Sequence, residues 1–259
     1  MAEENRMSFG DHLEVLRKMI LHVLSVTIVC AIGRFCFKEE TFAFLLAPRN
    51  TEFITFRTIE KILHYFGNGY VFDAYDIQLI STELSSQFMS HLETSFLLGV
   101  LLASPYIIYE VYKFISPALY ENERKYSTGV CVASYIMFII GFLMNYFVLF
   151  PIAFRFLGTY QVDASVVNTI TISSYISTFV SLSFTMGLVF ELPVLGFLLG
   201  KLGLLKSSFM RKYRRHSIIV IMVVAAFITP PDIFTLFLVT LPLYLLYETS
   251  ILIVSKVEN

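Results

Sequence analysis

Long stretches without a charged side chain constrain this sequence more than any other feature. Six such stretches occupy residues 19–33, 94–109, 126–154, 164–190, 216–231 and 233–247. An α-helix needs roughly 20 apolar residues to cross the ~30 Å hydrocarbon core of a bilayer. Only 15% of the 259 residues are charged, against about 25% in soluble domains. The pattern excludes a soluble enzyme, a disordered region and a basic nucleic-acid binder, and it indicates a polytopic membrane protein.

Helices, rather than strands, are expected to form the membrane spans. Strands of a transmembrane barrel alternate apolar and polar residues over ~10 positions, whereas residues 136–140 and 218–226 are apolar at consecutive positions. We therefore predict an all-α protein whose residues 1–259 form a single membrane domain with six transmembrane helices. The predicted spans are about 18–37, 88–112, 128–155, 171–200, 213–229 and 232–254.

The last two predicted spans look short. Thirteen residues lie between Arg215 and Thr229, and at 1.5 Å per residue they extend only about 20 Å. The final span has fifteen uncharged residues before Glu248 interrupts it, and it contains Pro242. A very tight turn, Thr229-Pro230-Pro231-Asp232, joins the two. Short helices must thin the bilayer locally or pack against their neighbours.

The distribution of positive charge predicts the orientation in the membrane. Six spans place both termini on one side, and thirteen of the nineteen Lys and Arg residues fall on that side. The densest cluster, residues 201–215, lies in a short loop, where the positive-inside bias is strongest. Both termini are therefore predicted to be cytoplasmic. The polar, acidic start of the chain has no small-residue cleavage site, so no signal peptide is expected.

Motifs for catalysis or cofactor binding are not recognisable in the sequence. The three cysteines, Cys30, Cys36 and Cys131, have no metal-type spacing, and no Gly-rich phosphate loop or nucleophile motif occurs. We expect no metal, no cofactor and no enzymatic activity.

Two acidic residues are predicted to lie within the membrane, Glu191 and Glu248. Glu191 precedes Lys201 by ten residues, which places it about 15 Å from the cytoplasmic end of its span. A carboxylate at that depth costs several kcal/mol unless it is protonated, paired or facing water. Pro193 frees a carbonyl and is expected to bend the helix. A functional role for Glu191 is favoured over a neutral acid that only holds two helices together.

Residues 8–18 at the start of the chain predict an amphipathic helix on the cytoplasmic interface. The segment begins with a capping-box pattern, Ser8 to Asp11, and its apolar residues recur at helical spacing. Glu14 and Arg17 are three residues apart and are placed to pair. An ordinary juxtamembrane anchor is the alternative interpretation.

Two loops remain open to more than one interpretation. In the cytoplasmic loop, Glu121 and Glu123 are acids where positive charge is expected, and they either attract a cationic partner or neutralise Arg124 and Lys125. The loop 38–87 on the other side is rich in aromatic residues. It is expected either to lie on the outer interface or to form a lid over the bundle.

Six stretches, in order from about residue 8 to residue 254, resemble motifs of the TatC family. They are His12–Lys18, Leu46-Ala47-Pro48, the loop Ser116–Arg124, Phe190-Glu191-Leu192-Pro193, Phe227–Asp232 and Tyr247-Glu248.

This resemblance implies a subunit of the twin-arginine protein translocase in the cytoplasmic (inner) membrane of a bacterium, an organellar membrane being the less favoured site. TatC-like proteins bind twin-arginine signal peptides and export folded proteins with single-span TatA-type and often TatB-type partners, using the protonmotive force. The resemblance also implies homo- and hetero-oligomers and contact with membrane lipid, but no nucleic acid.

The resemblance assigns site residues as well. Signal-peptide binding is carried over to Glu123, Arg124 and Arg17. The acid of the opening motif falls on Val15, so Glu14, about 100° round the helix, is carried over only as a substitute. Glu191 and Glu248 match intramembrane polar positions that contact partners. Structural motif positions are Pro48, Pro117, Pro193, Pro230, Pro231 and Asp232.

Two other functions are less favoured than a translocase. The first is a proton- or ion-coupled secondary transporter that uses Glu191, but the sequence shows no pair of repeated halves with interrupted helices. The second is an intramembrane enzyme, which lacks a nucleophile–base or metal-ligand pair.

Overall fold

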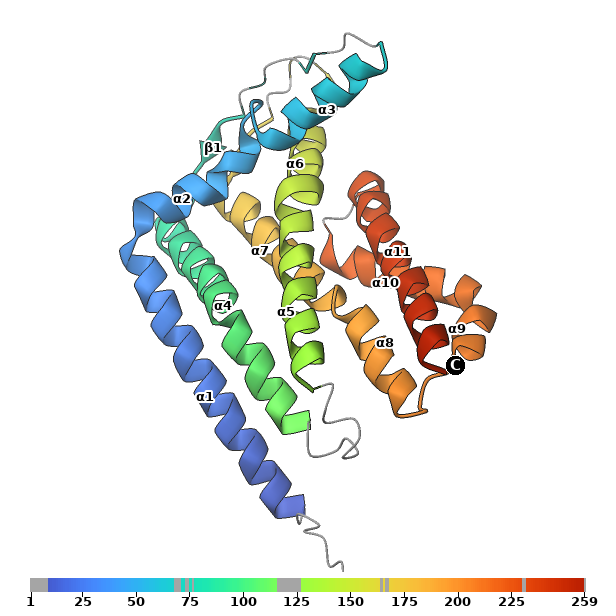
Figure 1. The fold of residues 1–259 in the computed structure, drawn as a ribbon. Coiled ribbons are helices and arrows are strands. Elements are labelled where there is room, and N and C mark those ends of the chain that lie inside the picture. Colours follow the sequence, from blue (N-terminus) through green and yellow to red (C-terminus); the bar gives the residue numbers. More distant parts are fainter. Residues whose placement is uncertain are drawn as a thin grey trace, which may run out of the picture.

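The structure is a computed structural model that describes residues 9–67, 71–72, 75, 77–115, 127–163, 165, 168–229 and 232–258. Nearly all regular structure in these residues is helical (Figure 1). The helices are α1 (Phe9–Cys36), α2 (Lys38–Leu46), η1 (Ala47–Arg49), α3 (Ile54–Tyr65), α4 (Ser86–Ile115), α5 (Ser127–Met144), η4 (Asn145–Leu149), α6 (Phe150–Thr159), α7 (Ile172–Val189), α8 (Leu192–Lys201), α9 (Ser207–Lys212), α10 (Arg214–Ile228) and α11 (Ile233–Glu258). Two short strands, β1 (Leu79–Ile80) and β2 (Ile170–Thr171), pair in parallel.

Five helical stretches of the described chain are long and apolar enough to cross a membrane. They are Leu13–Cys36, Ser86–Phe114, Thr128–Thr159, Ile172–Lys201 and Ile233–Glu258. The predicted class, an all-α polytopic membrane protein, is confirmed. The predicted fifth span corresponds to α10, whose 15 residues extend only about 22 Å. A sixth crossing and the cytoplasmic side of both termini stay predictions.

The last helix is longer than we predicted. We expected both of the last two spans to be short, but α11 runs for 26 residues through Pro242 and Glu248. Glu248 lies within the helix, and its carboxylate accepts hydrogen bonds from Arg214 and Tyr244. Only the first member of the pair, α10, is short.

The predicted span 171–200 is divided in two by the structure. Helix α7 ends at Val189 and α8 begins at Leu192, with Phe190 and Glu191 in the turn between them. Pro193 lies in the first turn of α8, where its missing N–H costs nothing. The bend expected at Pro193 is therefore present as a break between two helices.

The first span also differs from its prediction. Residues 9–36 form one uninterrupted helix rather than an interfacial segment followed by a span. No proline occurs between Phe9 and Cys36, so nothing in the backbone forces a break. Helix α1 packs along α4, and a Cβ added at Gly99 would lie 2.7 Å from the backbone of Ala31. The glycine therefore permits this close approach.

The hydrophobic core lies between α5, η4 and α6 on one side and α7 on the other. Four of its rings are fully or almost fully buried and meet edge to face: Tyr146, Phe150, Tyr175 and Phe179. Edge-to-face pairs of this kind add to the hydrophobic burial of the rings.

Helices α8 and α11 pack through small residues. Ideal Cβ positions at Gly196 and Gly200 lie 3.5 and 3.4 Å from side chains of α11, those of Ser250 and Val254. Small residues let helix backbones approach closely, which is the main source of helix association in a bilayer. At the end of α11, Glu258 accepts a hydrogen bond of 2.8 Å from the backbone N–H of Ser207 and so holds α9 in place.

Helices α2 and α3 lie across one end of the bundle, opposite the start of α1 (Figure 1). We call residues 38–67, together with Phe72 and Tyr75, the cap. Two buried hydroxyls hold it: Tyr146 donates to the carbonyl of Phe44, and Tyr175 donates to that of Leu45, both at 2.9 Å. The hydroxyl of Thr55 in α3 donates to the carbonyl of Phe147.

Cation–π contacts to Arg155 also hold the cap on the bundle. The guanidinium of Arg155 in α6 lies 5.1, 4.5 and 4.8 Å from the ring centres of Phe56, Phe72 and Tyr75. Burial raises the pKa of Tyr75 to about 12, against the opposing effect of Arg155 and Arg49, so its ring is neutral at ordinary pH. The packing of the cap on the bundle agrees with the expected lid, whereas a position on the outer interface stays a prediction. One face of the cap packs on the bundle, while other residues of α3 stay exposed.

Candidate functional site

The core of the predicted signal-peptide site, Glu123 and Arg124, lies outside the described residues, as does Pro117. The helices on either side of this loop are described: α4 ends at Ile115 and α5 begins at Ser127. These two helix ends and the start of α1 lie at the same end of the molecule (Figure 1). The fold thus brings the N-terminal segment and the ends of the predicted binding loop to one side of the bundle.

The start of α1 presents its charges to the surroundings. Glu14 forms an ion pair with Lys18 at 2.8 Å, not with Arg17 as expected, since the i,i+4 spacing also fits a helix. The Glu14 and Lys18 side chains are 64% and 66% exposed. An exposed pair of this type contributes only ~0.3–0.5 kcal/mol, so Glu14 can exchange Lys18 for another cation at little cost. Arg17 is exposed on the same helix.

Glu191 lies in the turn between α7 and α8, directly before the first residue of α8. The N–H of Glu191 donates to the carbonyl of Leu188, and its own carbonyl accepts from Leu195. Its side chain lies near Ser134 of α5. The carboxyl oxygen Oε1 is buried and has no hydrogen-bond partner among the described residues.

An apolar cavity of about 310 Å³ opens at the first turn of α8, next along the chain to Glu191, which does not itself line it. It lies between α5, α8 and α11, and its lining includes Ala133, Met137, Pro193, Val194 and Ile253. A buried oxygen without a donor costs about 1–3 kcal/mol. The unsatisfied acceptor is buried, so a partner helix could supply a donor to it only if the turn between α7 and α8 moved.

Sequence reasoning missed a second polar pair inside the bundle. Asn145, which is fully buried, donates a hydrogen bond of 2.8 Å from its amide nitrogen to the hydroxyl of Ser183 on α7. The amide oxygen of Asn145 has no partner among the described residues. Asn145 also begins the π-helical turn η4, a feature frequent at functional sites. A lone amide in the uncharged run 126–154 was the signal that could have identified it.

Glu248 has partners within the chain. Its carboxylate accepts a hydrogen bond of 2.7 Å from Arg214 and one of 2.9 Å from the hydroxyl of Tyr244. The Arg214 and Glu248 side chains are 45% and 27% exposed. The two acids predicted in the membrane therefore differ, since Glu248 joins α10 to α11 through an ion pair and Glu191 retains an unpaired oxygen.

The predicted structural motifs have clear local roles where they are described. Pro48 is buried in η1, directly after the α2 carbonyls that the two tyrosines bind. Asp232 caps α11 by accepting hydrogen bonds from the backbone N–H of Thr235, at 2.7 Å, and from its hydroxyl. Pro230 and Pro231 lie outside the described residues.

Nothing in the described part of the chain forms a metal site. No group of three or more His, Cys, Asp or Glu side chains comes together there, and the three cysteines are free thiols.

Comparison with known proteins places this geometry in a family. The family model described as Sec-independent protein translocase protein (TatC) matches residues 11–242. The TatC protein of Blattabacterium sp. subsp. Periplaneta americana is 35% identical over 97% of this chain and 96% of its own length. The TatC protein of Escherichia coli is 30% identical over 97% of this chain and 89% of its own length.

Solved structures agree with this match. A crystal structure of a twin-arginine translocase receptor, TatC, is similar with a TM-score of 0.77 and 26% identity, over 96% of this chain and all of that one. The same receptor crystallised in DDM gives a TM-score of 0.75 over 93% of this chain. The relatives are named as protein translocase components, which is a transport role and not an enzymatic one. The chain therefore belongs to the TatC family of Sec-independent protein translocase proteins.

Proposed function

We propose that this protein is the subunit that recognises twin-arginine signal peptides in the cytoplasmic membrane of a bacterium. With small single-span partners of the TatA type, and of the TatB type where one exists, it exports folded proteins using the protonmotive force. The observation that carries the proposal is the similarity to a twin-arginine translocase receptor over 96% of the chain.

The predicted binding residues suit a peptide with two adjacent arginines. A guanidinium binds a carboxylate through two parallel hydrogen bonds, which a lysine cannot reproduce. Glu123 and Glu14 are the acids at the proposed binding end, and Glu14 is exposed and only weakly engaged by Lys18. Arg17 and Arg124 balance the charge, which limits binding of unrelated cationic segments.

Glu191 suits a later step, the contact with a single-span partner or with the inserted signal peptide. Its unpaired Oε1 would accept a donor from an apolar helix once the turn between α7 and α8 moves, and the cavity at the first turn of α8 would accept apolar side chains of that helix. The short α10 supports a further part of the proposal. At about 22 Å it is shorter than the ~30 Å core, so the bilayer beside it would be thinned.

The test of receptor function is crosslinking of the membrane-embedded protein to a precursor. A precursor with Arg-Arg should crosslink strongly and one with Lys-Lys weakly. Glu123→Gln should reduce Arg-Arg crosslinking about tenfold, because a charge-assisted hydrogen bond is lost. The matched control is Glu121→Gln, two residues away in the same loop. Equal crosslinking of both precursors to the unaltered protein would refute the receptor role.

The test of the later step separates binding from transport. Glu191→Leu should leave signal-peptide crosslinking unchanged but abolish export of a folded twin-arginine cargo in a strain that lacks its own receptor. Glu191→Gln, which keeps the side chain polar, should retain more export than Glu191→Leu. Wild-type export by Glu191→Leu would show that the residue has no role in transport.

A further inference from the structure

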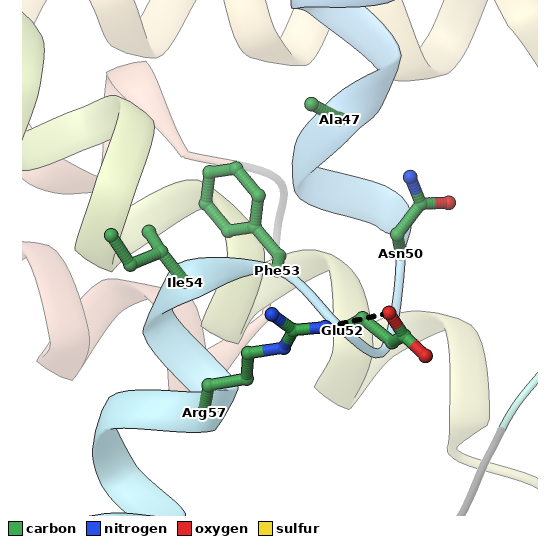
Figure 2. Close-up of a pocket in the computed structure, with 6 residues that line it drawn as sticks. All are labelled: Ala47, Asn50, Glu52, Phe53, Ile54 and Arg57. Carbon is green, nitrogen blue, oxygen red and sulfur yellow. Dashed lines mark hydrogen bonds and ion pairs between the residues drawn. The ribbon is translucent and has the colours of Figure 1, made fainter.

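A pocket of about 370 Å³ opens in the cap, between η1 and the first turn of α3 (Figure 2). Its lining residues are Ala47, Asn50, Glu52, Phe53, Ile54 and Arg57. The volume is within the range of small-molecule sites, about 300–1,000 Å³. The proposed function uses none of these residues.

The pocket has an apolar side and a polar side. Phe53 and Ile54 lie together on one side, and Asn50 and Glu52 lie on the other, with Arg57 reaching across the base (Figure 2). Arg57 donates a hydrogen bond of 2.7 Å to Glu52, and these side chains are 60% and 83% exposed. Because an ion pair this exposed contributes little to stability, a ligand with charges of both signs can replace it at small cost.

The pocket lies in the cap, just past the end of the first candidate membrane span, so we infer that it is at the membrane boundary. Helix α1 ends at Cys36, just before the cap, and α6 ends and α7 begins at the same end of the bundle (Figure 1). Helix α3 also exposes four apolar side chains, the last just past its final residue: Ile54, Ile62, Tyr65 and Phe66, from 52% to 87% exposed. The last three share one side of the helix end by their spacing, and Ile54 lies about 12 Å earlier along the axis on roughly the same side. We call these four residues the exposed row.

This exposed row suggests how deep the pocket sits in the lipid. Aromatic side chains on an amphipathic segment favour the headgroup level, with the apolar face against the acyl chains. Ile54 belongs both to the row and to the pocket lining. A lipid that contacts the row therefore has its headgroup next to the pocket.

We propose that this pocket binds the headgroup of a zwitterionic phospholipid that carries a phosphate and a primary ammonium group, as phosphatidylethanolamine does. Arg57 binds the phosphate, for which its planar guanidinium is suited. Glu52 accepts hydrogen bonds from the ammonium group, and the Asn50 amide donates to the phosphate. Phe53 and Ile54 contact the glycerol and the first methylene groups. This inference goes beyond the proposed function and does not depend on it.

The test measures lipid binding to the full purified chain by native mass spectrometry. Short-chain phosphatidylethanolamine, phosphatidylcholine and phosphatidylglycerol are titrated separately. The first should bind most tightly, since a trimethylated ammonium cannot donate a hydrogen bond to Glu52 and a glycerol headgroup has no cation. Arg57→Gln should weaken binding of all three lipids about tenfold, because all share the phosphate. Glu52→Gln should instead remove the preference for phosphatidylethanolamine over phosphatidylglycerol.

Control variants come from the same cap. Lys61→Gln in α3 and Glu39→Gln in α2 change exposed charges outside the pocket lining and should leave all three affinities unchanged. Circular dichroism checks that each variant keeps its helices. Unchanged lipid affinity in Arg57→Gln, or an unchanged preference in Glu52→Gln, would overturn the proposal. Free phosphoethanolamine that competes as well as the short-chain lipid would also overturn it, because the ligand would then not be a lipid.

Discussion

Gly141 marks a close approach of α5 and α7 and provides the sharpest test of the fold. A Cβ at this position would lie 2.4 Å from the carbonyl oxygen of Met186, and 2.9 Å both from its carbonyl carbon and from the Cβ of Phe190. Two of these atoms belong to the backbone and cannot rotate away. Gly141→Ala therefore requires α7 to shift, just before the turn that carries Glu191.

The size of the effect follows from two opposing contributions. Alanine in place of glycine within a helix favours folding by roughly 0.5–1 kcal/mol. Overpacking a tight contact costs roughly 1–3 kcal/mol, so Gly141→Ala should lower the free energy of unfolding by up to about 2.5 kcal/mol. Relative to an alanine that meets no neighbour, it should be less stable by about 1–3 kcal/mol. Gly129→Ala is the matched control on the same helix, because a Cβ there meets nothing within 4 Å. Gly129→Ala should be neutral or slightly stabilising.

The assay is unfolding of the detergent-purified protein, followed by circular dichroism at 222 nm. Tryptophan fluorescence cannot be used, since the chain contains no tryptophan. Both variants are compared at the same protein and detergent concentrations. If Gly141→Ala proved as stable as Gly129→Ala, α5 and α7 could not be packed as closely as the structure has them, and the reasoning would be refuted.

Three further predictions concern the helix ends and the cap. Asp232→Ala removes the side chain that satisfies the N-terminus of α11. It should lower the free energy of unfolding by about 1 kcal/mol and speed hydrogen exchange near Thr235, whereas Asp232→Asn should have a smaller effect. Equal exchange in all three proteins would contradict this role. Tyr175→Phe leaves the carbonyl of Leu45 without its donor and should lower the free energy of unfolding by about 1–3 kcal/mol. An unchanged unfolding curve would show that the hydrogen bond between Tyr175 and Leu45 contributes nothing to stability. Arg155→Met removes the cation from its three rings and should lower the free energy of opening of the cap by about 2 kcal/mol. Protease cleavage within α3 should become faster, with Arg155→Lys intermediate. Wild-type resistance to the protease in Arg155→Met would argue against the contact.

The two acids within the predicted spans show how tertiary contacts decide the state of similar residues. In the sequence, Glu191 and Glu248 look alike, since each follows a long uncharged run. In the structure, Arg214 comes from another helix to pair with Glu248, whereas Glu191 keeps one buried oxygen unpaired. Only the second arrangement leaves an acceptor unsatisfied.

Helix positions were largely predictable because the bilayer dictates them. A run of about twenty apolar residues has one stable solution in lipid, a helix that satisfies its own backbone. The uncharged runs therefore predicted four of the five long spans as long and located the fifth, α11, although they underestimated its length. The motif residues predicted the family. The capping role of Asp232 also fits its place directly before a helix.

The sequence by itself determined the class, the approximate spans and the TatC resemblance, because these depend on local composition and on short motifs. The tertiary structure alone decided that Arg214 pairs with Glu248, that Asn145 meets Ser183, and that Arg155 lies among the rings of the cap. Each of these contacts joins residues from different helices or from a helix and the cap. Such pairs depend on how the helices pack in three dimensions, which the hydrophobic pattern of a single segment does not contain.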